Sequence, residues 1–234
     1  MRMTIILAGL MATPFHSPLI AASLDQQSGW AAWSNSIKLS DRWSLISDVQ
    51  LRSNDGWERP RNFIGRAGAS YALTPTLSLA AGYAYIDTYT PDSPTLTENR
   101  TWQQLLLVQK IGGNPLTHRL RLEQRFIERA TGGDVYSDRL RYFARLQVPL
   151  QASGSKPFSH GYYAAFQNEV FLHLSGRSDL NGQLFDQNRA YAGIGFRISP
   201  RADVEVGYLN QYLNGSTRDT DNHVVQFSLF TRFL

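Results

Sequence analysis

The sequence predicts an all-β fold: a single antiparallel transmembrane β-barrel of about 10–12 strands, with short periplasmic turns and longer extracellular loops. Polar and apolar residues alternate from residue 29 onward, and no stretch of helical period competes with this pattern. Most candidate strands have 10–14 residues, more than the ~5–6 of globular strands and enough for the about 9–11 of a tilted membrane strand. The connections alternate between short and long, as in outer-membrane barrels.

The expected strands follow one another without a linker or a break in composition. In chain order they are 29–39, 43–52, 62–73, 76–89, 98–111, 117–128, 137–150, 161–174, 187–198, 202–213 and 223–234. The connections on one side are Ser40-Asp41-Arg42, Thr74-Pro75-Thr76, Ser199-Pro200-Arg201, 112–116 and the longer 151–160. Those on the other side are polar and mostly longer: 53–61, 90–97, 129–136, 175–185 and 214–222. The chain is therefore expected to form one domain.

Composition limits the class of protein. The chain has 234 residues, enough for one barrel, and no cysteine, which excludes disulfide frameworks and thiolate metal sites. Residues 1–22 have the features of a secretory signal peptide: Arg2, an apolar run over 5–12, and Ile20-Ala21-Ala22 before Ser23. The barrel is then expected to occupy residues 23–234. Beyond this leader, no segment approaches the ~20 apolar residues of a spanning helix.

Strand parity raises a difficulty at the N-terminal end. If the last strand ends on the short-turn side, counting back places the start of 29–39 on the exterior side. The mature N-terminus should instead lie in the periplasm. Either ten strands from Trp43 onward form the barrel, with 23–39 folded inside or beside it, or one strand has been missed. Bacterial single-chain barrels prefer even numbers, so ten is the parity-consistent choice.

One face of the expected strands carries charge and the other carries apolar side chains. Arginine suits a confined polar interior because its planar fork pairs with carboxylates and stays ionised. The predicted lumen charge network comprises Asp48, Arg66, Arg100, Arg119, Arg121, Glu123, Arg125, Arg139, Arg141, Arg145, Glu169, Arg189, Arg197 and Glu205. The predicted lipid-facing band comprises Leu45, Val49, Leu51, Leu77, Leu79, Leu106, Val108, Leu140, Leu146, Ile194, Phe196, Val204, Val206, Val225, Phe227 and Leu229.

Aromatic residues cluster near the strand ends, as in the girdles of a spanning barrel. Those expected near the short turns are Trp43, Tyr71, Phe196 and Phe233; those expected near the long loops are Trp57, Tyr85, Tyr89, Trp102, Tyr136, Tyr208 and Tyr212. A hairpin centred near 131–133 predicts Glu123 opposite Arg141, with Arg121 near Phe143 and Arg119 near Arg145. Gly193 and Gly195 are expected to relieve crowding or to permit a bend.

The chain resembles a family of bacterial outer-membrane barrels known only as a domain of unknown function. The resemblance covers nearly all of the mature chain and comes with no activity. It rests on ENRTWQQ (98–104), HRLRLEQRF (118–126), RLRYFARLQVPL (139–150), NEVFLHL (168–174), FDQNRAYAGIGFRIS (185–199) and VEVGYLNQY (204–212). The terminus also resembles an outer-membrane assembly signal in Phe227, Leu229 and Phe233, although Leu234 takes the place of the final aromatic residue.

The sequence offers little support for catalytic or metal chemistry. A lipid hydrolase or acyltransferase needs a serine, histidine and acid at one rim; His173 and His223 lie near the long loops, but parity points His173 inward and His223 outward. Ser175, Asp179 and Asp221 could orient them, yet no serine sits in a nucleophile motif. No group of acidic residues and histidines has the sequence spacing typical of metal ligands. No cofactor is expected. The arginines face a lumen, so nucleic acid is not an expected partner.

The sequence therefore predicts a non-enzymatic outer-membrane barrel of a Gram-negative bacterium. Its arginines either fill the lumen structurally or line a narrow, porin-like, anion-preferring pore. The expected partners are outer-membrane lipid and lipopolysaccharide, the barrel-assembly machinery acting on the C-terminal strand, and a small anionic solute. Two alternatives stay open: a lipid-modifying enzyme with a rim histidine, and a soluble periplasmic barrel that binds a ligand.

Overall fold

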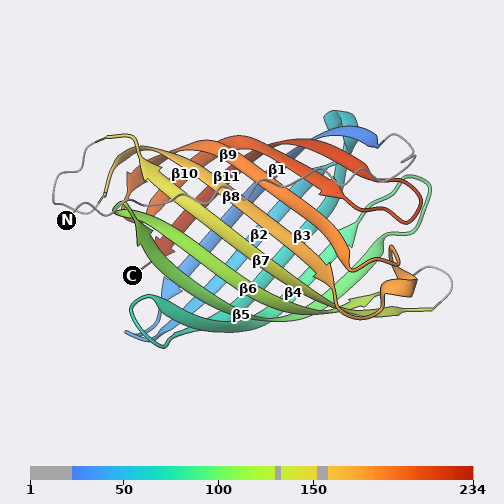
Figure 1. Cartoon of the computed structure of the whole chain (residues 1–234), viewed down its shortest axis with the longest axis horizontal. Helices are drawn as coiled ribbons and strands as arrows, with labels where there is room; N and C mark the ends of the chain where they lie inside the picture. The colour runs from blue at the N-terminus through green and yellow to red at the C-terminus, as the bar shows by residue number, and fades with distance from the viewer. Residues whose placement is uncertain (1–22, 130–132, 152–157, 234) are drawn as a thin grey trace, which may run out of the picture.

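A computed structural model describes residues 23–129, 133–151 and 158–233. The predicted signal peptide, 1–22, lies outside the described residues. Eleven strands close into one barrel (Figure 1). They are β1 Leu24–Lys38, β2 Trp43–Ser53, β3 Pro60–Ala72, β4 Leu77–Thr88, β5 Leu96–Ile111, β6 Asn114–Ile127, β7 Val135–Pro149, β8 Gly161–His173, β9 Phe185–Ser199, β10 Ala202–Leu213 and β11 Thr220–Phe233. Two short 3₁₀ helices, η1 Asp55–Trp57 and η2 Arg177–Asp179, lie in connections.

The all-β barrel and its alternating connections confirm the predicted fold class. Strands adjacent in the chain pair antiparallel, so each hairpin joins at one of the two ends of the barrel. In Figure 1 the loops that carry η1 and η2 lie at the right end, and the tight turns lie at the left with the end of β11. Within the described residues, no helix is long and apolar enough to cross a membrane.

Eleven strands fall within the predicted 10–12, but the ten-strand alternative, with 23–39 folded inside or beside the barrel, was wrong. β1 is a full strand of the wall, hydrogen-bonded to β2 on one side and to β11 on the other. Its pairing with β11 is parallel, with Leu24 opposite Thr220 and Ile37 opposite Phe233. An odd number of up-and-down strands can close only through one parallel pair. This pair lets β1 start at the loop end, as the parity count required.

Small side chains make room for large rings on the inner wall. Trp30, Tyr163, Ala165, Tyr191, Leu209 and Val224 form one buried apolar cluster, and Ile64, Ala80, Ala84, Ile86 and Trp102 form a second. A Cβ at Gly195 would overlap the Tyr163 ring, and one at Gly193 would overlap the Tyr191 ring. The expectation that these glycines relieve crowding is therefore confirmed.

The outer face carries most of the predicted apolar band. Leu45, Val49, Leu51, Leu79, Ile194, Val204, Val206, Val225, Phe227 and Leu229 are all exposed. Leu106 and Val108 were wrongly assigned to it, because Leu106 pairs with Arg119 and Val108 with Thr117 on the inner face. Trp102 is not part of a girdle either, since it is 2% exposed and packs in the second inner cluster. The predicted rim residues Trp43, Trp57, Tyr136, Tyr208 and Phe233 are exposed.

Candidate functional site

The centre of the lumen is an arginine–carboxylate network organised around Glu123. Glu123 projects inward from the second half of β6 and is 1% exposed. Its Oε2 accepts a hydrogen bond from Arg139 Nη2 at 2.7 Å, and its Oε1 accepts one from Arg141 Nη1 at 2.5 Å. Arg100 and Arg121 approach the same carboxylate at 3.7 and 3.9 Å. One buried carboxylate thus organises four guanidinium groups.

Glu169 extends the network to β8. Arg141 Nη2 donates to Glu169 Oε1 at 2.8 Å, and Arg119 Nη2 donates to the same oxygen at 2.7 Å. Because Arg141 also binds Glu123, it links the two carboxylates across three neighbouring strands. Charge-assisted bonds of this kind are stronger than neutral ones, and their low exposure limits screening by salt.

Further ion pairs surround this centre, and the structure brings all fourteen predicted residues onto the inner face. Arg66 pairs with Asp48 at 2.7 Å, and Arg145 pairs with Glu205 at 2.5 Å. Three carboxylates in the network were not predicted. Glu98 binds Arg100 and Arg125, Asp186 binds Arg139, and Asp203 binds Arg197 and Arg232. Even-numbered residues of β5 point inward. Glu98 has the same parity as the predicted Arg100, and this shared parity could have identified it.

The predicted register of the β6–β7 hairpin was wrong by two residues. Glu123 lies opposite Arg139, Arg121 opposite Arg141, and Arg119 opposite Phe143. A shift of two keeps every side chain on its expected face, because the side-chain period of a strand is two. The Glu123–Arg141 contact still forms, but as a diagonal ion pair.

A cavity of about 530 Å³, here called the vestibule, lies above the network at the loop end of the barrel. Its lining includes eight arginines and only three acidic residues: Arg52, Arg61, Arg66, Arg100, Arg125, Arg129, Arg139, Arg189, Asp55, Glu98 and Asp186. The excess of positive charge within low-dielectric walls gives the vestibule a potential that attracts anions.

Two guanidinium groups at the base of the vestibule lie against one indole ring. Arg52 Cζ lies 3.8 Å from the Trp30 ring centroid, and Arg189 Cζ lies 5.0 Å from it. Arg52 donates to Gln50 Oε1, Arg189 donates to Gln187 Oε1, and neither pairs with a carboxylate among the described residues. Arg52 Nε is buried without a hydrogen-bond partner. Both therefore lack the direct ion pair that the arginines of the network make, although Glu169 lies opposite Arg189 on the neighbouring strand.

The lumen continues toward the short turns through two more cavities. One of about 170 Å³ shares Trp30, Arg52, Arg66 and Arg189 with the vestibule. The other, of about 520 Å³, is lined at the turn end by Ser36, Lys38, Ser44, Leu106 and Val108, among others. Network side chains line both the vestibule and the 170 Å³ cavity.

The rim histidines lie as parity predicted, on opposite faces. His173 points inward, and its Nε2 is 3.4 Å from Asp186 Oδ1. His223 lies outside, with its Nδ1 2.6 Å from Tyr208 Oη. Ser175 Oγ donates to Asp138 Oδ2, so this hydroxyl is engaged with an acid and not with His173.

Comparison with known proteins places the chain in a family defined by sequence. An uncharacterized protein of Methylorubrum extorquens is 28% identical over 192 residues, which cover 81% of each chain. No solved structure matches the chain. A family model described as "Protein of unknown function (DUF2490)" matches residues 27–222. The chain therefore belongs to the DUF2490 family of proteins of unknown function.

Proposed function

We propose that this protein is an integral barrel of a Gram-negative outer membrane, with a lumen closed by its arginine–carboxylate network and a vestibule that attracts small anions. The observation that carries the proposal is the inverted polarity of the barrel. Glu123, Arg139 and Arg141 are buried inside, whereas Val206, Phe227 and Ile194 are exposed on the outer face. A barrel in water buries its apolar face, but a barrel in lipid turns that face outward.

Aromatic side chains near both ends support the same orientation. Trp43 and Tyr71 pack together beside the short turns, with ring centroids 4.9 Å apart. Phe126 and Tyr136 pack together toward the loops, with ring centroids 5.3 Å apart. Amphipathic rings at two heights fit the two interfaces of a bilayer. On this proposal the partners are lipid, lipopolysaccharide at the loop end, and the assembly machinery that receives the C-terminal strand.

Structural filling is the reading of the lumen that the geometry favours over an open pore. Barrels of about eight strands are filled by side chains, whereas those of about 16–18 leave a clear channel. Here the paired charges occupy the middle, and the unpaired Arg52 and Arg189 lie at the base of the vestibule. A small anion would enter from the loop end and stop above the network. The narrow anion-preferring pore is the second candidate, favoured by the same excess of arginine.

Two measurements test the proposal separately. Membrane integration predicts that the protein stays with membranes after salt and carbonate washes, is extracted only by detergent, and migrates differently on gels with and without heating. Release into the aqueous fraction would contradict it. A closed lumen predicts no steady current in planar bilayers. A steady current whose reversal potential in a salt gradient shows anion preference would establish the pore instead.

A further inference from the structure

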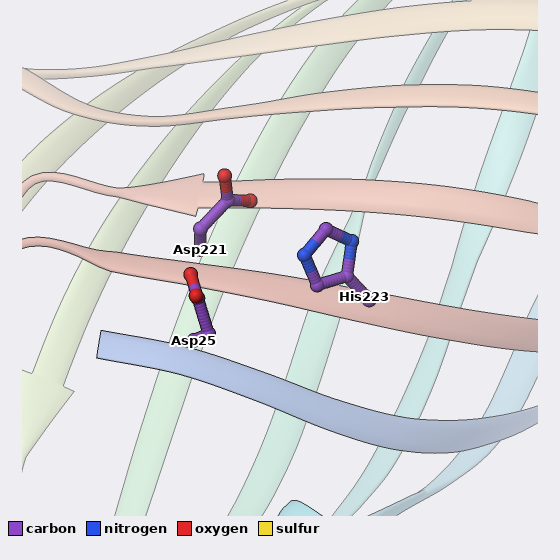
Figure 2. Close-up of side chains that lie close together, drawn as sticks. All are labelled: Asp25, Asp221 and His223. Carbon is purple, nitrogen blue, oxygen red and sulfur yellow. The ribbon is translucent and has the colours of Figure 1, made fainter. Parts of the chain in front are cut away.

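The parallel seam between β1 and β11 brings three metal-ligating side chains together. Asp25 of β1 lies directly opposite Asp221 of β11, and His223 follows two positions along the same strand. Odd-numbered residues of both strands face outward, so all three side chains share the outer face near the loop end. Figure 2 shows the three side chains close together, with Asp25 on β1 and with Asp221 and His223 on the adjacent β11. None of the three is buried.

The donor atoms are close enough to share one ion. One carboxylate oxygen from each aspartate and one imidazole nitrogen all lie within 4.8 Å of one another. Metal–oxygen and metal–nitrogen bonds of about 2.0–2.2 Å place the ligands of a tetrahedral ion about 3.4 Å apart. Rotation of the three side chains can bring their donor atoms from within 4.8 Å to this ligand spacing without movement of either strand.

Neighbouring side chains already orient two of the three ligands. Tyr208 Oη lies 2.6 Å from His223 Nδ1, and the two rings stack with centroids 6.0 Å apart. This contact occupies Nδ1 and leaves Nε2 as the nitrogen available to an ion. Asn210 Nδ2 donates to Asp221 Oδ1. Such supporting hydrogen bonds fix the ring orientation and the tautomer of metal-binding histidines.

Electrostatics favours a cation at the same place. Two carboxylates directly opposite on paired strands repel each other and weaken the pairing. Among the described residues, no lysine or arginine forms an ion pair with the Asp25 carboxylate, and the Asp221 carboxylate accepts a hydrogen bond from the neutral Asn210 amide. A divalent ion would neutralise both acids and connect the strands whose pairing closes the barrel.

We propose that Asp25, Asp221 and His223 bind a divalent transition-metal ion, of the class that includes zinc and cobalt, across the β1–β11 seam. An imidazole with two carboxylates suits this class, whereas calcium and magnesium prefer oxygen ligands alone. Three protein ligands leave positions for water or for an external oxygen ligand. The site is independent of the contents of the lumen.

The chain supplies a matched control on the same outer face. His118 Nδ1 lies 2.8 Å from Tyr142 Oη, and these rings stack with centroids 6.1 Å apart. His118 thus repeats the His223–Tyr208 arrangement. In the described part of the chain, the group with metal-ligand spacing contains His223 and not His118. The two histidines differ in that His223 has Asp25 and Asp221 within metal-ligand spacing.

The test is zinc titration of the detergent-solubilised, untagged full chain by calorimetry, after treatment with a chelator. The wild type is expected to bind one ion at this site, and its midpoint of thermal unfolding should rise with zinc. His223→Ala and Asp25→Asn should each weaken binding at least tenfold and abolish the thermal shift, whereas His118→Ala should change neither. Tyr208→Phe should weaken binding by about tenfold, because it removes the group that orients the imidazole.

Cobalt absorption spectra give a second readout of the same ligands. Cobalt bound to the wild type should show bands that are lost in His223→Ala and kept in His118→Ala. Asp25→Asn is the most informative variant, because Asp25 is exposed and its loss should leave the fold intact. Gel mobility with and without heating verifies folding. Equal zinc affinity in wild type, Asp25→Asn and His223→Ala would overturn the proposal.

Discussion

Glu123 on β6 lies directly opposite Arg139 on β7, and their Oε2 and Nη2 atoms are 2.7 Å apart. The same carboxylate holds Arg141 through its other oxygen. It therefore compensates two guanidinium groups that the fold has removed from water. Such ion pairs fill the inner wall of the barrel together with the two buried apolar clusters.

Glu123→Gln should destabilise the folded barrel strongly. Removing one partner of a buried ion pair leaves the other charge uncompensated, at a cost of about 3–5 kcal/mol. Urea unfolding of the detergent-solubilised protein, followed by tryptophan fluorescence, measures the change. Asp41→Asn serves as the control, because the Lys38–Asp41 pair is exposed and should contribute nothing measurable. Equal stability of Glu123→Gln and wild type would contradict the proposed role of the network.

The vestibule variant Arg52→Gln, combined with Arg189→Gln, should lower affinity for small anions. Within the described residues these two guanidinium groups form no direct ion pair, so their charge at the base of the cavity is available to an anion. In a background with the other four tryptophans replaced by phenylalanine, quenching of the fluorescence by iodide reports access to Trp30, whose ring both guanidinium groups contact. The double variant should show less quenching, whereas Arg42→Gln at a short turn should match the wild type. Unchanged quenching in the double variant would exclude the vestibule as an anion site.

Gly195→Ala should destabilise the barrel by about 1–3 kcal/mol, the cost typical of overpacking. The added methyl would overlap the buried Tyr163 ring. Gly65→Ala is the matched control, because a Cβ there meets Phe63 only at 3.7 Å, an ordinary contact. The Tyr163→Leu background should reduce the effect of Gly195→Ala. If urea unfolding shows the same loss in both backgrounds, the clash with Tyr163 is not its cause.

The parallel seam makes a prediction that a ten-stranded barrel does not. Ala31 lies opposite Phe227, and the chain has no native cysteine. The double variant Ala31→Cys with Phe227→Cys should therefore cross-link with a short bifunctional thiol reagent in the folded protein. Ala31→Cys with Leu45→Cys should not, since Leu45 pairs with Ile37. A seam pair that never cross-links would place β1 elsewhere.

Alternation predicted the faces of the strands well, because the side-chain period of two depends only on local geometry. Arg119, Arg121 and Arg125 all project inward as expected. Alternation could not predict which residues pair, because register depends on the geometry of the turn. Glu123 therefore lies opposite Arg139 and not opposite Arg141. Leu106 and Val108 were assigned by their apolar character against the parity of their own strand.

The contacts that were missed join residues far apart in the chain. The β1–β11 pairing brings Asp25 beside Asp221, and no local pattern reports that an odd-numbered barrel closes with a parallel pair. Trp102 was assigned to a girdle by its position near a strand end, although its parity pointed inward. Glu98 shares that parity and pairs with Arg125 of the next strand. Parity was thus the more reliable guide wherever it conflicted with residue type.

The most direct test of the membrane orientation is the collision accessibility of a nitroxide spin label in reconstituted vesicles. A label at Phe227→Cys should collide readily with oxygen, which is concentrated in lipid, and rarely with a water-soluble nickel chelate. A label at Ser36→Cys, facing the 520 Å³ cavity at the turn end, should show a lower ratio of oxygen to nickel accessibility. Free access of the nickel chelate to the label at position 227 would contradict a lipid-facing outer surface.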